Sequence, residues 1–407
     1  MKYDFSSKVS RSSSGSLKWA SMYEKNPRVG KGIVPLSVAD MELPNPPEVI
    51  EALVGYLQGG AVLGYMGPTD EFVDACVSWQ ARHHGWMPQK SSLVTSPGVV
   101  PAIYNAVRSL TDPGDGVIVQ SPVYYPFSEA VKRAGRTLVD NPLRVVELED
   151  GSHRYEMDFE DLERKVASPR VKLLILCSPH NPVGRVWTAE ELRRLLDACV
   201  RNDVIVIADE IHDDLIMPGI THTAIMSVAE AGEYDHLVVC TAPSKTFNLA
   251  GCQASAIYIP DESLRDRFVG GLRDIPLGSL NAFAYVSTTA AYTLCDEWLE
   301  QLIGLVWGNF ELLRGTLNNY HPELEVYPLE GTYLAWVDFR PWGLTNEELE
   351  RFMCQDALLF LDEGYIFGEG GGGFERFNLA CPRSVMEESL ERLVHAAHVR
   401  GLGTTRG

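Results

Sequence analysis

A lysine placed shortly after an apolar run is the most informative residue in this sequence of 407 residues. Lys245 follows the run at residues 236–240, which is apolar after its first residue and is typical of a buried strand. Ligands of open α/β sheets bind at the carboxyl ends of the strands, where this lysine stands. A lysine withdrawn from water loses its proton readily and forms an imine with a carbonyl compound. The position of Lys245 therefore favours carbonyl chemistry, and a solvated surface lysine is the alternative.

Two further polar side chains follow predicted strands. Asp209 ends the apolar run at 203–208, and a carboxylate there can hold a protonated ring nitrogen as a charge-assisted pair. Asn181 lies in the segment 178–184, whose two prolines and glycine define a turn at the end of another strand. Its amide offers a neutral donor and acceptor to the crevice at the sheet end, and a cap on its own turn is the alternative.

A metal site is the rival interpretation of the acidic segment that follows Asp209. Carboxylate and imidazole side chains cluster there, at Glu210, His212, Asp213 and Asp214. Such clusters do bind metals, but no second cluster stands at a recognisable ligand spacing. Solvated loop charges are the simpler account, and the sequence predicts no metal.

Two glycine-containing segments suggest binding sites for anions. Residues 98–102 follow a short strand and open a helix with Pro101 in its first turn, where backbone amides can cradle a phosphate. An ordinary strand–helix turn is the alternative. Residues 368–373 match GxGxxG, but the following segment 374–380 is typical of a strand, which excludes a dinucleotide site. Arg376 in that strand could clamp a carboxylate with two hydrogen bonds, or form a structural salt bridge.

Composition limits the class of protein. The formal net charge of −20 argues against non-specific binding to nucleic acid or an anionic membrane surface. No apolar run approaches the length of a membrane span, and the first residues lack the apolar core of a signal peptide. Eight scattered cysteines form no CxxC pair. We expect a cytoplasmic protein without disulfides.

The order of the elements predicts an α/β fold. Short runs rich in Val and Ile, typical of strands buried on both faces of a mainly parallel sheet, lie at 117–120, 171–177, 203–208, 237–240 and 254–259. Amphipathic helices lie between them, the clearest at 188–201, where Thr188 and Glu191 form a capping box. From about 280 the pattern changes to long helices at 281–320, a strand at 332–338 and a terminal helix from 384. A smaller α+β domain, completed by the N-terminal segment, is therefore expected beside the large domain.

Taken together, these segments resemble the class I/II aminotransferase superfamily of pyridoxal-phosphate enzymes (fold type I). More narrowly, they resemble the cystathionine β-lyases of the MalY/PatB type, also called C–S lyases. The similar segments run nearly from end to end, at 16–19, 38–41, 64–65, 121–127, 177–187, 209–212, 244–251, 330–336 and 374–378. The resemblance implies a three-layer α/β/α large domain over residues 48–288. An N-terminal arm at 1–47 and a small domain at 289–407 would complete the chain.

The resemblance also implies a role for each matching residue. Lys245 would hold pyridoxal 5'-phosphate as an imine and then act as the base, with Tyr124 stacked on the ring as the second catalytic residue. The other cofactor-binding residues would be Asp209, Asn181, His212, Val99, Val100, Ser244 and, from a neighbouring subunit, Tyr65. The substrate would be bound by Arg376, Ala39, Asn181 and Tyr125. The role of Tyr65 implies a homodimer with shared active sites.

The implied activity is the α,β-elimination of L-cystathionine or cysteine-type S-conjugates to a thiol, pyruvate and ammonia. An aminotransferase with the same cofactor is the alternative, because both reactions begin with removal of the α-proton. An additional regulatory binding role is a third possibility, since some members of this family also bind a transcription activator. The N-terminal arm departs from the common pattern at Ala20, Ser37, Glu42 and Leu43, which affects the expected substrate preference and not the cofactor.

Overall fold

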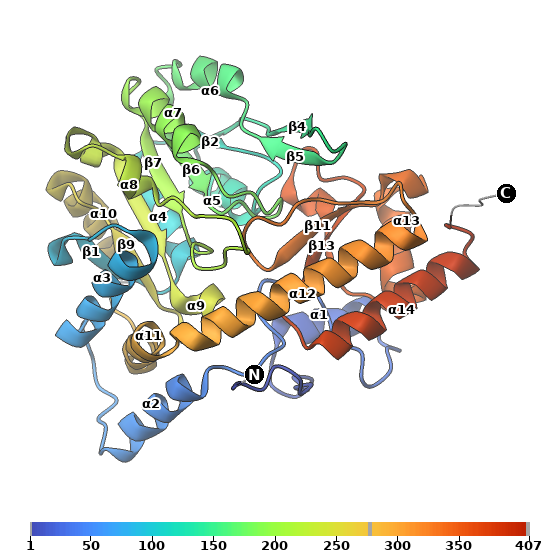
Figure 1. Cartoon of the computed structure of the whole chain (residues 1–407). Helices are drawn as coiled ribbons and strands as arrows, with labels where there is room; N and C mark the ends of the chain where they lie inside the picture. Colours follow the sequence, from blue (N-terminus) through green and yellow to red (C-terminus); the bar gives the residue numbers. More distant parts are fainter. Residues whose placement is uncertain (1, 276–278, 404–407) are drawn as a thin grey trace.

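The computed structural model describes residues 2–275 and 279–403 and contains two adjoining layered units around a large and a small sheet (Figure 1). The large sheet has seven strands in the order β1-β9-β8-β7-β6-β2-β3. These strands are β1 (Leu93–Ser96), β2 (Gly116–Val119), β3 (Thr137–Asp140), β6 (Val171–Cys177), β7 (Ile205–Asp209), β8 (Leu237–Thr241) and β9 (Ser255–Tyr258). The strands predicted from the apolar runs are therefore present, with ends shifted by one or two residues.

The large sheet is mainly parallel, as expected. Strands β3, β2, β6, β7 and β8 pair in parallel, whereas β9 runs antiparallel to both β8 and β1. Neighbouring residues along a strand face opposite cores: Ile207 belongs to one buried cluster, and Val206 and Ala208 belong to the other. This double burial explains why the strands appear as continuous apolar runs without polar alternation.

Helices cover both faces of the large sheet. One face packs against α4 (Val99–Leu110), α5 (Pro126–Arg133) and α10 (Glu262–Asp274), and the other against α6 (Phe159–Val166), α7 (Ala189–Val200) and α8 (Ile225–Val228). The predicted capping box of α7 is present, because Thr188 accepts from the backbone of Glu191 and Glu191 accepts from that of Thr188. The three-layer α/β/α arrangement is thereby confirmed.

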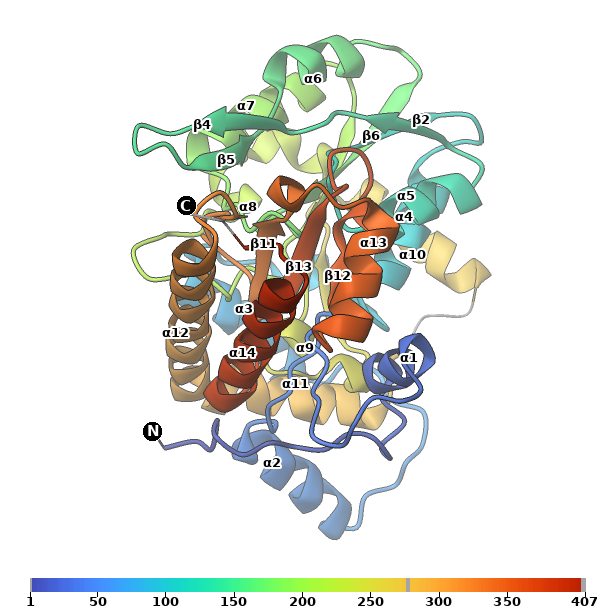
Figure 2. The same ribbon diagram turned by 90° about the vertical axis from the view of Figure 1, so that its right-hand side faces the viewer.

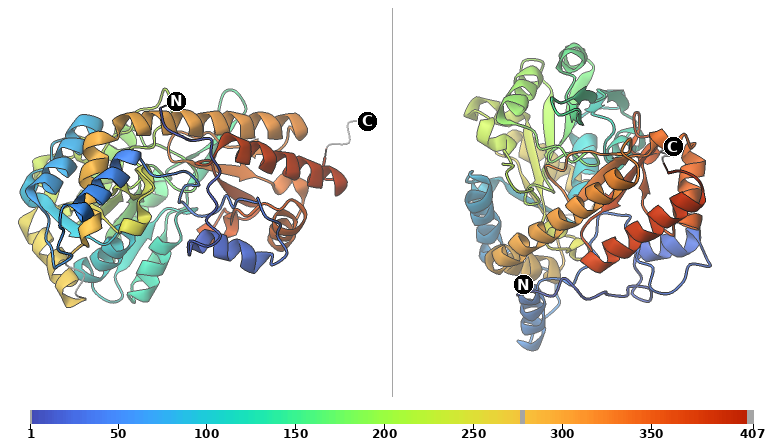
Figure 3. Two further views of the ribbon diagram at one scale, coloured as in Figure 1. Left: turned by 90° about the horizontal axis from the view of Figure 1, so that it is seen from below. Right: turned by 45° about the vertical axis from the view of Figure 1, so that its right-hand side comes forward.

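The small sheet is antiparallel, in the order β10-β11-β13-β12. Its strands are β10 (Glu325–Val326), β11 (Leu334–Asp338), β12 (Asp362–Glu363) and β13 (Phe374–Asn378). The long helices α12 (Asp296–Tyr320) and α14 (Arg383–Val399) pack beside it, with α13 (Asn346–Arg351) at the opposite side (Figure 2). Helix α12 extends along both units, which links them mechanically (Figure 3).

The N-terminal segment joins the small sheet. Leu36 donates its backbone N–H to Phe360 and accepts from the N–H of Asn378, so the segment adds to the strands that carry Arg376. Helix α1 (Leu17–Lys25) belongs to this segment, whereas α2 (Pro47–Gln58) projects from the body of the molecule (Figures 1 and 2). The domain boundaries at 47/48 and 288/289 stay a prediction.

Three further α-helices and one hairpin complete the fold. They are α3 (Asp70–His84), α9 (Pro243–Thr246), α11 (Ala282–Leu294) and the hairpin of β4 (Arg144–Glu147) with β5 (His153–Glu156). Within residues 2–275 and 279–403, no helix combines the length and the apolar character needed to cross a membrane.

Candidate active site

Lys245 lies at the carboxyl end of β8, in the single turn of α9, and its half-buried side chain lines a cavity. Its Nζ donates a 2.6 Å hydrogen bond to the backbone oxygen of Ala39, which comes from the N-terminal segment. Burial, together with the positive charge of Arg376, lowers the pKa of Lys245 to about 8. The amine is therefore partly neutral near physiological pH, which is the form that acts as a nucleophile or a base.

Asp209 is the last residue of the neighbouring strand β7 and is buried. Its Oδ1 accepts a 3.2 Å hydrogen bond from the backbone N–H of Ile211. Burial raises the pKa of Asp209 to about 7, although the charge of Lys245 opposes this shift. A cationic ring nitrogen would supply the counter-charge that this carboxylate needs.

Asn181 and Tyr124 stand beside this pair. Asn181 follows β6, and its backbone oxygen accepts from the N–H of Tyr124 at 3.1 Å. The side-chain Oδ1 of Asn181 accepts from Nη1 of Arg376 at 2.7 Å, which leaves its NH₂ group for a ligand. The ring of Tyr124 lies edge-on to Phe127, and burial raises the pKa of Tyr124 well above its usual value. The hydroxyl is therefore neutral.

The start of α4 forms the anion-binding end of the site. Gly98 precedes the helix with φ +115°, a conformation that favours glycine. The first amides of a helix have no partner within it, so the N–H groups of Val99 and Val100 are available. The hydroxyl-bearing Ser244 lines the same cavity, which makes this end suitable for a phosphate.

One cavity of about 320 Å³ gathers most of the predicted residues. Its lining includes Ala39, Val99, Val100, Tyr124, Asn181, Asp209, His212, Ser244 and Lys245. Cavities of this size accommodate small molecules and cofactors. The cavity brings together an amine, a buried carboxyl group, an aromatic ring and free helix amides. These groups match the aldehyde, the ring nitrogen, the ring face and the phosphate of pyridoxal 5'-phosphate. The residues present therefore fit the expected cofactor.

His212 lies on the cavity wall, edge-on to Tyr333 at a ring separation of 6.1 Å. Burial and the charges of Lys245 and Arg376 lower the pKa of His212 well below its usual value. The imidazole is therefore neutral. Its Nδ1 is buried and accepts or donates no hydrogen bond among the described residues, as expected of a group that awaits a ligand or water.

Arg376 lies in β13 and is buried. Besides Asn181, it contacts Asp362, whose Oδ2 is 2.5 Å from Nη2, and its guanidinium lies over the ring of Phe367 at 4.7 Å. Its charge acts on Lys245, so it lies close to the cavity, although it does not form the wall itself. Arg376 thus forms the structural salt bridge that was one of its two expected roles. It also keeps free N–H groups, which the other role, binding a substrate carboxylate, requires.

Two predicted residues lie elsewhere. Tyr65 is fully exposed on the segment after α2, as its assignment to a partner subunit requires. Tyr125 is 48% exposed and lines an adjoining hollow with Asp362 and Tyr365, while its ring centre lies 5.5 Å from that of Tyr124. Within one chain, neither residue contributes to the wall of the main cavity.

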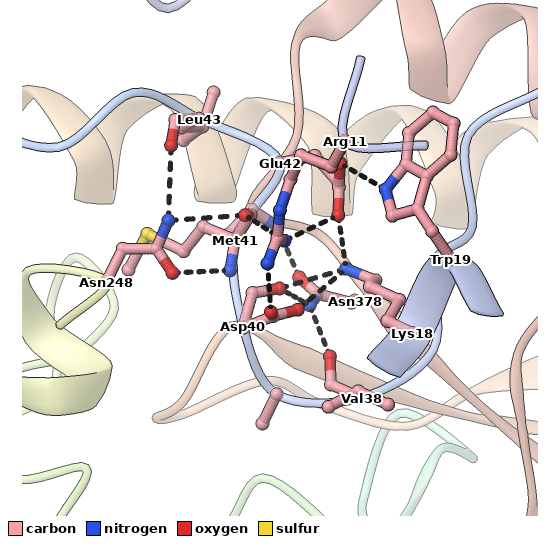
Figure 4. A network of polar contacts seen from close by, with 12 residues as sticks. Arg11, Lys18, Trp19, Val38, Asp40, Met41, Glu42, Leu43, Asn248 and Asn378 are labelled. Atoms are coloured by element: carbon pink, nitrogen blue, oxygen red, sulfur yellow. Dashed lines mark hydrogen bonds and ion pairs between the residues drawn. The ribbon is translucent and has the colours of Figure 1, made fainter. Parts of the chain in front are cut away.

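The loop at 38–43 is fixed by side chains from four other segments (Figure 4). Asn378 donates to the backbone oxygens of Val38 and Asp40, and Asn248 bonds to both the N–H and the oxygen of Met41. The buried ammonium of Lys18 lies 3.1 Å from Oε1 of Glu42. This network determines where the carbonyl of Ala39 meets Lys245.

Several contributing residues were not identified from sequence. Tyr333 donates its hydroxyl to the oxygen of Ala39 at 2.9 Å, and Gln253 and Cys177 line the cavity. Tyr333 lies inside a segment that the resemblance had marked, but its role depends on a contact across nearly 300 positions of sequence. Asp362 carried no local signal, because an isolated acid in a short strand is common on protein surfaces.

The residues that the sequence offered as metal ligands lie in two different places in the structure. Asp213 and Asp214 join His84 in a group whose ligand atoms lie within 4.8 Å of one another, whereas His212 faces the main cavity. His84 Nε2 is 2.8 Å from Asp214, which also accepts from Trp79 and Thr246. Despite burial, the adjacent Asp213 and Asp214 raise the pKa of His84 to about 9. A buried ion pair accounts for these contacts.

Comparison with known proteins assigns the family. Residues 31–393 match the model of aminotransferase class I and II. The chain is 41% identical to cystathionine beta-lyase PatB of Bacillus subtilis over 88% of this chain and 91% of that protein. It is 32% identical to protein MalY of Escherichia coli over 97% and 98%. The crystal structure of cystalysin from Treponema denticola, which contains pyridoxal 5'-phosphate, superposes with a TM-score of 0.94 at 45% identity, covering 98% and 100%. The chain belongs to the class I and II aminotransferase family and has the expected fold type I architecture.

Proposed function

We propose that this protein is a pyridoxal-phosphate-dependent carbon–sulfur β-lyase. Its substrates would be L-cystathionine and related cysteine S-conjugates, each of which would react with one water molecule to give a thiol, pyruvate and ammonia. The observation that carries the proposal is the convergence of Lys245, Asp209 and Asn181, from three adjacent strand ends, in one cavity. Relatives named as cystathionine β-lyases match over most of their length, which supports the lyase reaction.

Different residues of the cavity would bind different groups of the cofactor. Asp209 would pair with the ring nitrogen, Asn181 would donate to the phenolic oxygen, and Tyr124 would stack on the ring, with His212 close by. The amides of Val99 and Val100 and the hydroxyl of Ser244 would bind the phosphate. When bound, the cofactor supplies an electron sink for the carbanion that forms at the substrate Cα.

Lys245 would move the protons of the reaction. Its lowered pKa keeps a fraction of Nζ neutral, so that this atom can take the α-proton of the substrate. The electron pair of the Cβ–S bond then leaves with the sulfur, which is released as a thiol after it gains a proton. In the cofactor-free protein, the hydrogen bond from Lys245 to Ala39 holds the amine within the cavity before the cofactor binds.

Arg376 would bind the substrate carboxylate, with Asn181, Tyr125 and the backbone at Ala39 nearby. The hydrogen bond to Asn181 holds Nη1 of the guanidinium, and Asp362 pairs with Nη2 while no substrate is bound. A planar fork held in this way suits the two oxygens of a carboxylate. Substitution of Arg376 should accordingly weaken substrate binding more than it slows the chemical step.

We also propose a homodimer in which Tyr65 completes the phosphate site of the partner. Exposed apolar side chains support this proposal, since they lie close together in sequence along α2 and the following segment: Ile50, Val54, Leu57, Val62 and Leu63. Large apolar side chains that lie exposed near one another are typical of an interface. The division into an arm (1–47), a large domain (48–288) and a small domain (289–407) belongs to the same proposal, as does a cytoplasmic location, which the eight free cysteines favour.

The test is to give purified, cofactor-loaded protein L-cystathionine without any keto acid, and to follow free thiol and pyruvate together. Equimolar, catalytic release of both products is expected. Turnover that requires an added keto acid, without thiol release, would instead identify an aminotransferase. The Lys245→Ala protein serves as the control for background release, because free pyridoxal phosphate can itself react slowly with amino acids.

A further inference from the structure

Asp362 accepts hydrogen bonds from two groups that face the substrate region. Its Oδ2 lies 2.5 Å from Nη2 of Arg376 and 2.8 Å from the backbone nitrogen of Val38. Val38 has φ +53°, which is unusual for a β-branched residue and marks a constrained backbone. The same oxygen therefore joins the arginine of the small sheet to the loop of the N-terminal segment.

These two donors are the ones that would bind the substrate carboxylate under the proposed function. Arg376 is the expected carboxylate clamp, and Val38 immediately precedes Ala39, whose backbone is expected to assist it. Arg376 is only 4% exposed, so its charge needs a counter-ion whenever no substrate is present. Asp362 supplies that counter-ion from within the chain.

The structure also provides room for Asp362 to move. Its side chain is 15% exposed and lines a hollow separate from the main cavity, together with Tyr125, Lys132 and Arg133. A rotation toward this hollow would bring the carboxylate to the side where Lys132 lies, while Arg133 is already paired with Glu129 at 2.9 Å. An exchange of one carboxylate for another would leave the charge around Arg376 unchanged.

We propose that Asp362 occupies the substrate-carboxylate subsite in the resting enzyme and is displaced when the substrate carboxylate binds. This inference rests on the proposed function, and it makes Asp362 a specificity-determining residue. Only a ligand whose anionic group competes with an internal carboxylate for Arg376 and Val38 gains full access. Neutral analogues leave Asp362 in place.

The test measures binding of 3-(methylthio)propanoate to the cofactor-loaded protein by calorimetry, since this acid has no amino group with which to react. Asp362→Asn retains the side-chain shape but removes the competing charge. We expect this variant to bind the acid about fivefold to tenfold more tightly than the wild type. The KM for L-cystathionine should fall by a similar factor, with kcat changed less than about twofold.

Two controls separate this effect from a general change in the site. The neutral 3-(methylthio)propanamide should bind both proteins equally. Asp338→Asn removes a carboxylate from a different Asp–Arg pair on the same small sheet, with Arg340, and should leave the affinity for the acid unchanged. Unchanged or weaker binding of the acid to Asp362→Asn would overturn the proposal, because it would mean that Asp362 only holds Arg376.

If the Asp362→Asn variant does not fold, a crystal structure of the wild type with 3-(methylthio)propanoate tests the displacement of Asp362 instead. Asp362 should then have left Nη2 of Arg376, and its continued presence there would contradict displacement. Failure of the lyase assay does not affect this result, since binding of the acid requires no turnover. Conversely, an active lyase whose Asp362 stays in place would refute the displacement alone.

Discussion

Lys245 donates its hydrogen bond to the backbone oxygen of Ala39, a residue 206 positions earlier in the chain. The amine at the end of β8 is thus held by the N-terminal segment, which also adds to the small sheet. The position of the reactive nitrogen consequently depends on three parts of the chain at once. The loop network around Ala39 is as relevant to the site as the strand ends are.

Substitution of Lys245 by Ala should remove both the covalent attachment of the cofactor and the base. We expect turnover of L-cystathionine to fall at least about a thousandfold and the long-wavelength absorption of the bound cofactor to change. Absorption spectra and initial rates measure the two effects. Lys172→Ala, on β6 and partly exposed, is the control. A normal spectrum in Lys245→Ala would refute the cofactor assignment.

Asp209→Asn should have opposite effects on stability and on activity. In the cofactor-free protein the pKa of Asp209 is raised to about 7 by burial, so the unfolded chain releases this proton first as pH rises. Asp209 therefore lowers the free energy of unfolding progressively as pH rises from about 4 to 7. The loss is complete above pH 7 and absent below about pH 4. The cofactor-free variant should be more stable than wild type at pH 8, by up to about 4 kcal/mol.

Urea unfolding at pH 4 and pH 8 measures this difference. The loaded Asp209→Asn protein should nevertheless lose most of its turnover, because a neutral amide cannot hold a charged ring nitrogen. Equal stability differences at both pH values would mean that Asp209 is not a buried, unpaired acid in the cofactor-free state.

His84 should stabilise the fold at low pH. The pKa of His84 is raised to about 9 by its carboxylate neighbours, above the unfolded value of 6.5. Its contribution is complete below pH 6.5 and is lost as pH rises through 9. The stability difference between wild type and His84→Gln should therefore be larger at pH 6 than at pH 9.5, by up to about 3 kcal/mol.

The unfolding free energy at both pH values, measured by urea titration of loaded protein, checks this expectation. Glu210, Asp213, Asp214 and His222 surround the ring, and their pKa values depend on the charge of His84, so the difference reports the titration of the whole group. His83→Gln is the control, because its partner Asp296 is exposed and such pairs contribute under about 1 kcal/mol. A difference independent of pH would show that His84 is not paired in its charged form.

Lys18→Met tests the network in Figure 4. Lys18 is 1% exposed and contacts the carboxylates of Glu42 and Asp40, and its loss leaves Glu42 buried with one charge partner fewer. We expect a loss of about 3 kcal/mol in unfolding free energy, together with a higher KM, because the Ala39 loop loosens. Lys2→Met removes an exposed pair with Glu297 and should cost under about 1 kcal/mol. A stable Lys18→Met protein with unchanged KM would contradict this role.

The strands and the polar residues at their ends were predictable from local sequence. Residues such as Val206 and Ile207 alternate between two apolar cores, which forces a continuous apolar run, and Asp209 interrupts this run where the strand reaches the cavity. The cap of α7 was equally local, since Thr188 and Glu191 are three positions apart. Because β6, β7 and β8 are adjacent and parallel, Asn181, Asp209 and Lys245 lie at the same carboxyl end of the sheet.

Contacts between distant segments could not be read in this way. The antiparallel direction of β9, the pairing of His84 with Asp214, and the contact of Asp362 with both Arg376 and Val38 depend on how complete elements pack. Isolated polar residues carry no periodic signal that identifies their partner. The sequence alone therefore determined the chemistry available at each strand end, because periodicity and capping are local. Only the tertiary structure decided which charges meet, because a buried charge is stabilised by a counter-charge that packing brings from a distant segment.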